Sequence, residues 1–198
     1  MTSLLAVLTL LAVLSGGFCQ NRLYRSVLSV TNGGQWGDWY NVEMCPENYY
    51  AIGFSLRVEG GQGDGDDTAL NGIRLYCAAE NRHGFVHTVE SNSGFWGGWT
   101  SAQYCDGGVL TAFQLRVEAP VGGGDDTAAN NIRFRCSSNP TLEGQGMGWG
   151  DYGGWSETCT NGGICGIKTK VEGRQGGGDD TALNDVRFYC CDRKMNNK

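Results

Sequence analysis

The sequence has little proline, little helical periodicity and no metal-type cysteine pairs, and each scarcity excludes a class of protein. It has 3 prolines against 33 glycines, and glycine does not recur at every third position, so the chain is not collagen-like. Aromatic residues make up 11%, which is too many for a disordered chain. The nine cysteines do not form the C-x2-C pairs of zinc sites. We therefore expect neither a metal site nor a cofactor.

Charged side chains are also missing from the first twenty residues. An apolar run over residues 4–14 is followed by small residues at Ser15, Gly16 and Gly17. Such a run is too short to span a bilayer and is typical of a secretory signal peptide. We predict a signal peptide over residues 1–19, with cleavage after Gly17 or Cys19 left open. No other long apolar run follows, so we expect a secreted, extracellular protein with no membrane span.

The remaining eight cysteines are an even number, which in an oxidising compartment predicts up to four disulfides. The formal net charge of −6 argues against a nucleic-acid partner held through phosphate contacts. The two histidines, His83 and His87, cannot be placed beside a Ser or Cys nucleophile, and no catalytic residue is assigned.

One unit is written three times in the chain. Each copy has a block with a basic residue, Val and Glu, then Asp-Asp-Thr-Ala, Asn, Ile or Val, Arg and a cysteine, over residues 57–77, 116–136 and 170–190. A Trp-Gly or Tyr-Gly motif and a further cysteine precede each block; alignment places these motifs at residues 36–39, 96–99 and 152–155. We predict a single domain over residues 20–198, built from units of about 26–80, 81–138 and 139–192.

Within each unit, apolar residues alternate with polar ones. Phe54, Leu56 and Val58 share one parity, as do Phe113, Leu115 and Val117 in the second copy. Period-two alternation is typical of half-buried antiparallel strands. The sequence therefore predicts an all-β fold. Three equal β units can bury their inner faces against one another by closing around a pseudo-threefold axis, which avoids exposed sheet edges.

The repeated blocks, the Trp-Gly-x-Trp motif and the terminal pair Cys190-Cys191 together resemble the vitelline membrane outer layer protein 1 family, from about Ser26 to Cys191. This resemblance implies a β-prism of the first type, with three Greek-key sheets of four strands. It also implies a secreted component of the egg's outer coat, whose partners would be other coat glycoproteins. A similar prism occurs in jacalin-like lectins, and the family has been linked to chito-oligosaccharide transfer.

Three hypotheses for function follow. The leading one is a structural component of an extracellular coat, such as the outer layer of the egg vitelline membrane. The second is a carbohydrate-binding module that holds oligosaccharides in a groove at one end of the prism. The third is a weak chito-oligosaccharide transferase.

A pair of adjacent aspartates occurs in every copy. A functional interpretation makes them carboxylates for sugar or calcium, whereas a structural one has them cap turns and pair with arginines. Recurrence in all three copies favours the structural interpretation, because a single active site needs one constellation. Asp67, Asp126 and Asp180 are nonetheless the candidate sugar-binding carboxylates.

The tryptophans lie within or beside the Trp-Gly motifs, and Trp39, Trp99 and Trp155 are the candidates for stacking on a sugar. The alternative, which we favour, is that they fill core volume left open by neighbouring glycines.

Repeat alignment pairs Cys45 with Cys77 and Cys105 with Cys136. In the third unit, alignment favours Cys159–Cys190 and Cys165–Cys191, whereas strand parity places Cys165 and Cys190 in one register. That pairing stays open. Because features common to all copies are explained by architecture, function is sought where the copies differ, as at Asp64, at Ala119-Pro120 and at the extra Cys165 and Cys191.

Overall fold

The computed structural model describes residues 22–60, 69–79, 81–118, 129–138, 140–173 and 183–194. Residues 1–19, predicted to be a signal peptide, lie outside these ranges, as do Asp64, Ala119-Pro120 and the paired aspartates. The described residues form strands and turns, and none of them belongs to a helix long and apolar enough to cross a membrane.

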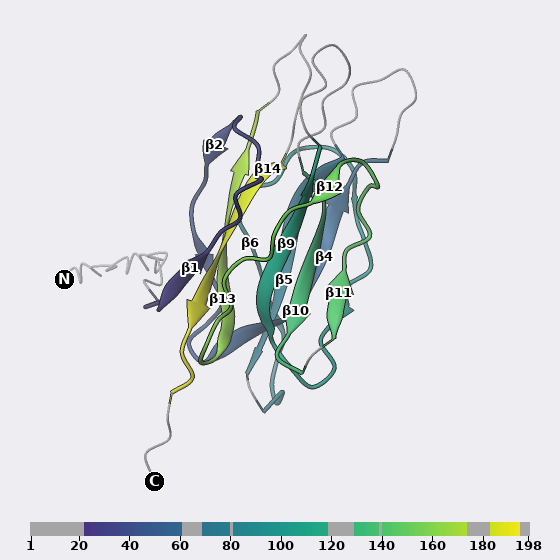
Figure 1. Ribbon diagram of the computed structural model, residues 1–198. Helices are drawn as coiled ribbons and strands as arrows, with labels where there is room; N and C mark the ends of the chain where they lie inside the picture. Colours follow the sequence, from purple (N-terminus) through teal and green to yellow (C-terminus); the bar gives the residue numbers. More distant parts are fainter. Residues whose placement is uncertain are drawn as a thin grey trace, which may run out of the picture.

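Three antiparallel sheets make up the molecule (Figure 1). Sheet A has the order β1 (Ser26–Leu28), β14 (Leu183–Cys191), β13 (Gly163–Val171) and β2 (Asp38–Trp39), with β3 (Glu43–Met44) also paired to β13. Sheet B has the order β6 (His87–Glu90), β5 (Leu70–Ala79), β4 (Tyr49–Val58) and β7 (Gly98–Trp99), with β8 (Gln103–Tyr104) also paired to β4. Sheet C has the order β11 (Thr141–Glu143), β10 (Ala129–Cys136), β9 (Leu110–Val117) and β12 (Asp151–Tyr152). The all-β expectation is confirmed.

Each sheet is completed by a short strand from a distant part of the chain. The long hairpin β4–β5 takes up β7, β9–β10 takes up β12, and β13–β14 takes up β2. Sheet A also includes β1, so it joins the beginning of the described chain to its end (Figure 1). The Trp-Gly segments thus link one hairpin to the next unit.

One core fills the space between the three sheets. Four fully buried phenylalanines meet there: Phe54 of sheet B, Phe113 and Phe134 of sheet C, and Phe188 of sheet A. The ring centroid of Phe134 lies 4.7 Å from that of Phe54 and 5.1 Å from that of Phe188. All three sheets therefore share a single hydrophobic centre, as closure around an axis requires.

A β-bulge interrupts the long hairpin of every sheet at an equivalent place. The register shifts between Ala51 and Gly53, between Leu110 and Ala112, and between Ile164 and Gly166. The extra residue in a bulge is left unpaired and changes which face its neighbours occupy. Cys165 is that residue in sheet A, so strand parity cannot be carried across it.

The eight described cysteines form four disulfides: Cys45–Cys77, Cys105–Cys136, Cys159–Cys190 and Cys165–Cys191. Cys190 packs in the main core, whereas Cys165 and Cys191 belong to a second, smaller apolar cluster with Tyr50 and Ile52. The bulge explains this division, because it turns Cys165 away from the face that Cys190 occupies.

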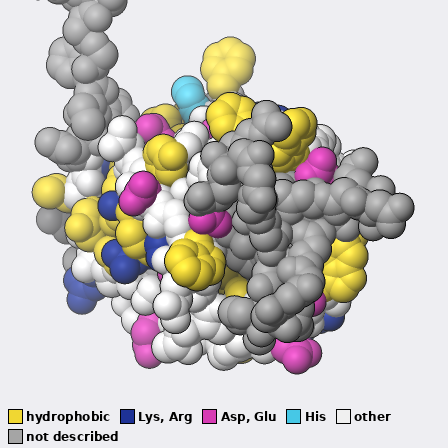
Figure 2. Space-filling view, turned by 90° about the horizontal axis from the view of Figure 1, so that it is seen from above, with side chains coloured by type: hydrophobic (Ala, Val, Ile, Leu, Met, Phe, Trp, Pro, Cys, Tyr) yellow, Lys and Arg dark blue, Asp and Glu magenta, His cyan; other side chains and the backbone are white. Residues whose placement is uncertain are grey.

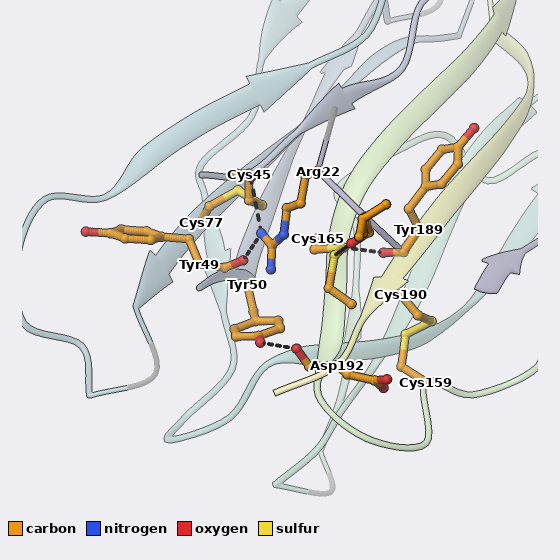
Figure 3. The surroundings of a disulfide bond; sticks show 12 residues. Arg22, Cys45, Tyr49, Tyr50, Cys77, Cys159, Cys165, Tyr189, Cys190 and Asp192 are labelled. Carbon is orange, nitrogen blue, oxygen red and sulfur yellow. Dashed lines mark hydrogen bonds between the residues drawn. A yellow bond between two sulfur atoms is a disulfide. The ribbon is translucent and has the colours of Figure 1, made fainter. Parts of the chain in front are cut away.

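Arg22, the first described residue, binds the backbone near this cluster (Figure 3). Its guanidinium donates hydrogen bonds to the carbonyl oxygens of Cys45, Pro46 and Tyr49, at 3.1, 2.7 and 2.6 Å. The hydroxyl of Tyr50 donates to the carbonyl oxygen of Asp192 at 2.7 Å. Both ends of the described chain are therefore held at the start of β4 and the residues just before it.

Candidate functional site

The segments that connect the two strands of each long hairpin all lie at the same end of the molecule. Strands β4, β9 and β13 end there and strands β5, β10 and β14 begin there (Figure 1). The chain between these strands contains the candidate residues Asp67, Asp126 and Asp180, which lie outside the described residues. We call this end of the molecule the hairpin end.

Three turns of the same geometry flank the hairpin end. Gly37, Gly97 and Gly150 adopt φ values of 78°, 76° and 69°. A Cβ atom at any of them would collide with the backbone of the valine at the end of the paired strand. Because only glycine tolerates both constraints, the glycine of the Trp-Gly dipeptide is a requirement of this turn.

These turns correct the alignment of the third unit. The strand equivalent to β2 and β7 is β12, so the third motif is residues 149–152 and the counterpart of Trp39 and Trp99 is Tyr152. The alignment on residues 152–155 is wrong by three residues. Both segments have an aromatic residue, Gly, one further residue and a second aromatic residue, and the strand pairing of Asp151 and Tyr152 selects residues 149–152.

A basic side chain holds each turn in place. Arg57 donates to the carbonyl oxygens of Gly94, Phe95 and Gly97, at 2.9, 2.6 and 3.2 Å. Arg116 and Lys170, at the same position of the other two blocks, likewise donate to backbone carbonyls of their turns. We call this contact the turn clamp. It gives the basic residue of the repeated block a role that the sequence did not reveal.

The first aromatic residue of each turn is exposed. Trp36, Trp96 and Trp149 have exposed fractions of 63%, 44% and 38%, and Phe95 beside Trp96 reaches 77%. Seen from above, hydrophobic side chains lie on several sides of the hairpin end (Figure 2). These rings offer flat apolar faces of the kind that stack on sugars, and sequence reasoning did not select them.

The second aromatic residue of each turn lies on the outer face of a sheet. The guanidinium carbon of Arg74 lies 3.9 Å from the ring centroid of Trp99, and that of Arg187 lies 4.3 Å from the ring centroid of Trp39. The guanidinium carbon of Arg135 lies 4.5 Å from the ring centroid of Trp155. The expectation that tryptophans fill the core is wrong, because the buried core contains phenylalanine and aliphatic residues but none of the six tryptophans.

The equivalent position in sheet C is a hydrogen-bonded group. The guanidinium of Arg133 lies 3.9 Å from the Tyr152 ring centroid and also donates to Glu143 at 2.8 Å. The Tyr152 hydroxyl donates to the other oxygen of Glu143 at 3.1 Å. Burial raises the pKa of Tyr152 well above its usual range, and the neighbouring carboxylate raises it further. This arrangement orders the turn and keeps the phenol protonated.

The described residues contain no group of three or more His, Cys, Asp or Glu side chains that could hold a metal ion. His83 and His87 are both exposed, and the His87 ring packs edge-on against Tyr49 at 5.1 Å.

Comparison with known proteins gives the family. Residues 26–193 match the family model of vitelline membrane outer layer protein I. The chain belongs to this family. The chain is 58% identical to the human vitelline membrane outer layer protein 1 homolog over 170 residues, which cover 85% of the chain and 84% of that protein. It is 52% identical to the mouse homolog over 192 residues, which cover 93% and 95%.

Solved structures share the fold at low sequence identity. Calystegia sepium agglutinin has a TM-score of 0.54 at 11% identity, and the match covers 85% of this chain and 96% of the lectin. A single-chain recombinant jacalin has a TM-score of 0.54 at 14% identity, with 86% and 97% covered. Artocarpin, solved with a mannopentose, has a TM-score of 0.53 at 12% identity, with 85% and 97% covered. The β-prism expected for this family is confirmed, and at this identity the likeness concerns the fold alone.

Proposed function

We propose that the protein is a secreted structural component of an extracellular coat, such as the outer layer of the egg vitelline membrane. The carrying observation is the placement of the four disulfides, whose cysteines are all buried. Buried sulfurs are protected from reductants, and cross-links that close loops limit unfolding. A prism with one shared core and four protected cross-links is suited to persist in a coat.

The partners on this proposal are other coat glycoproteins. The four disulfides and the family membership support an extracellular location. The exposed aromatic side chains of the three turns supply apolar contact area for such partners, since aromatic residues are enriched at protein interfaces.

The test is retention of the protein in a coat. Tagged recombinant protein is incubated with isolated vitelline membranes, washed with salt, and exposed to protease. We expect it to remain bound and intact, while a variant with Cys159 and Cys190 replaced by serine is degraded. Loss of the intact protein in the salt wash, or equal degradation of both forms, would contradict the proposal.

A second candidate function is carbohydrate binding at the hairpin end. It is favoured by one observation, the exposure of Trp36, Trp96 and Trp149 in equivalent turns on a lectin-like fold. An aromatic face contributes to sugar recognition through apolar contact. Asp67, Asp126 and Asp180 would add hydrogen bonds.

A glycan array tests this second function. We expect binding to at least one oligosaccharide, lost when Trp36, Trp96 and Trp149 are changed together to alanine and kept when the exposed Phe85 is changed instead. An array without signal above background would remove carbohydrate binding at this end and leave the structural proposal standing.

A further inference from the structure

Each sheet has an arginine–aromatic pair at an equivalent position of its outer face. Arg74 lies over Trp99 in sheet B, Arg133 over Tyr152 in sheet C, and Arg187 over Trp39 in sheet A. The three arginines therefore occupy equivalent positions, and their neighbours can be compared sheet by sheet.

In sheets B and C the arginine is neutralised. Arg74 forms a salt bridge with Glu90 at 2.9 Å, and Arg133 forms one with Glu143 at 2.8 Å. The glutamate comes from the neighbouring edge strand, directly opposite the arginine. The residue facing the arginine on the other side is uncharged in both sheets: Ser55 faces Arg74, and Gln114 faces Arg133.

Sheet A lacks this edge-strand glutamate and gains a second cation. The pairing of Leu28 with Phe188 places Ser29 where the other sheets have glutamate. On the other side, Lys168 is the direct cross-strand partner of Arg187. Within the part of the chain that the structure describes, neither cation has a carboxylate at salt-bridge distance.

The two cations converge on one ring. The Lys168 Nζ atom lies 5.9 Å and the Arg187 guanidinium carbon 4.3 Å from the Trp39 ring centroid. Arg187 is exposed, whereas Arg74 and Arg133 are half-buried. Like charges directly opposite each other destabilise a sheet. The chain therefore keeps at this place an arrangement that folding alone disfavours.

Other polar groups near the pair have partners of their own within the chain. Asp185, two residues before Arg187 on β14, interacts electrostatically with both Arg187 and Lys170. Its Oδ1 also accepts a hydrogen bond from the amide of Val186 at 2.8 Å. Lys170 donates to the carbonyl oxygens of its turn. Tyr189 packs its ring against that of Tyr24. Asp185 is shared between Arg187 and Lys170 and forms no salt bridge with Arg187 or Lys168, so an external anion can supply the further counter-charge for this pair.

We propose that Arg187 and Lys168 form an anion-binding site on the outer face of sheet A, for the sulfate or carboxylate group of an acidic saccharide. The planar guanidinium donates two parallel hydrogen bonds to such a group, and the ammonium adds a third charge-assisted bond. Trp39 orients both cations. This site rests on the extracellular location proposed above, where sulfate esters and carboxylates are the anions available, and it is separate from the exposed tryptophans of the hairpin end.

The test measures binding of three hexasaccharides by calorimetry at physiological salt. The probes are a sulfated heparin fragment, the same fragment after chemical desulfation, and neutral chitohexaose. We expect the sulfated fragment to bind and chitohexaose not to bind at this site. Binding of the desulfated fragment would show that a carboxylate suffices, and its failure would show that the site requires sulfate.

Two variants copy the other sheets into sheet A. Lys168→Gln reproduces the Gln114 of sheet C, and Ser29→Glu reproduces the glutamate that neutralises Arg74 and Arg133. Each removes or occupies at least one charge-assisted hydrogen bond, so we expect each to weaken binding of the fragment about tenfold or more. The melting temperature of Lys168→Gln should equal or exceed that of the unmodified protein.

The matched control is Arg74→Gln, which removes the same charge from the outer face of sheet B. We expect it to leave the affinity unchanged. If no acidic saccharide binds, or if Arg74→Gln weakens binding as much as Lys168→Gln, there is no specific site on sheet A. A lower melting temperature for Lys168→Gln, with unchanged affinity for both variants, would assign Lys168 a structural role and also overturn the proposal.

Discussion

Replacing Phe134 with alanine tests whether the three sheets depend on one core. The side chain is fully buried, and its ring contacts Phe54 of sheet B at 4.7 Å, Phe188 of sheet A at 5.1 Å and Phe113 of its own sheet at 6.4 Å between centroids. Replacing a buried phenylalanine with alanine lowers the free energy of unfolding by about 3–5 kcal/mol. The aromatic pairs place this site toward the upper part of that range. For a chain of this length, such a loss lowers the melting temperature by roughly 6–20 °C.

The assay is guanidinium unfolding with the disulfides intact, followed by far-UV circular dichroism and by tryptophan fluorescence. Because tryptophans lie on all three sheets, a shared core predicts that both probes report one transition at the same lowered midpoint. Phe85→Ala, at a side chain with 86% exposure, is the control and should leave the midpoint unchanged. A loss below about 1 kcal/mol, or two separated transitions, would refute the single shared core.

Three further predictions concern the turn clamp, the extra disulfide and a half-buried carboxylate. Arg57→Gln should lower the free energy of unfolding by about 1–2 kcal/mol, because three backbone carbonyls lose a charged donor. The same change should speed amide hydrogen exchange in the turn that contains Trp96. Unchanged exchange there would contradict the turn clamp. Replacing Cys165 with Ile and Cys191 with Ala, the residues of the equivalent places in sheet B, should keep the fold but lower its stability to denaturant by about 3 kcal/mol; an equal or higher stability would show that the bond does not restrict the unfolded chain. Burial raises the pKa of Asp185, so the folded state holds its proton more tightly and this residue's contribution to stability falls as pH rises from the ordinary carboxyl range through the raised pKa. Asp185→Asn should therefore stabilise the protein more at pH 7 than at pH 3 in urea titrations, and the reverse order would refute this sign.

The strands and the threefold plan could be predicted from the sequence because both rest on local patterns. Phe54 and Leu56 alternate with Ser55 and Arg57, and the structure buries the first pair in the core. The identical spacing of three blocks predicts three equivalent hairpins, which the structure contains. Period-two alternation needs no knowledge of distant contacts, and for that reason it identified the long strands.

The sequence did not reveal features that depend on pairing between strands. Parity placed Cys165 with Cys190, but the bulge at Cys165 resets the alternation, and a bulge is defined by the partner strand. The tryptophans were expected in the core, yet none is buried, and Trp39 and Trp99 lie in two-residue edge strands whose partners come from another unit. The turn clamp was missed for the same reason, since Arg57 and the carbonyls it holds are 37 to 40 residues apart.

Symmetry within the chain separates what folding requires from what it merely permits. The glycine of each turn and its clamp recur in every copy because each hairpin needs the same closure. Departures from the repeat are not explained by a requirement that all three hairpins share, and they are of two kinds. Cys165–Cys191 departs in a way that adds a cross-link, so stability explains it. Lys168 departs in a way that places two like charges on one ring, with no carboxylate of the described chain at salt-bridge distance from either, and stability argues against it. A departure that folding disfavours needs another cause, and binding of an anion supplies one that the matched substitutions can test.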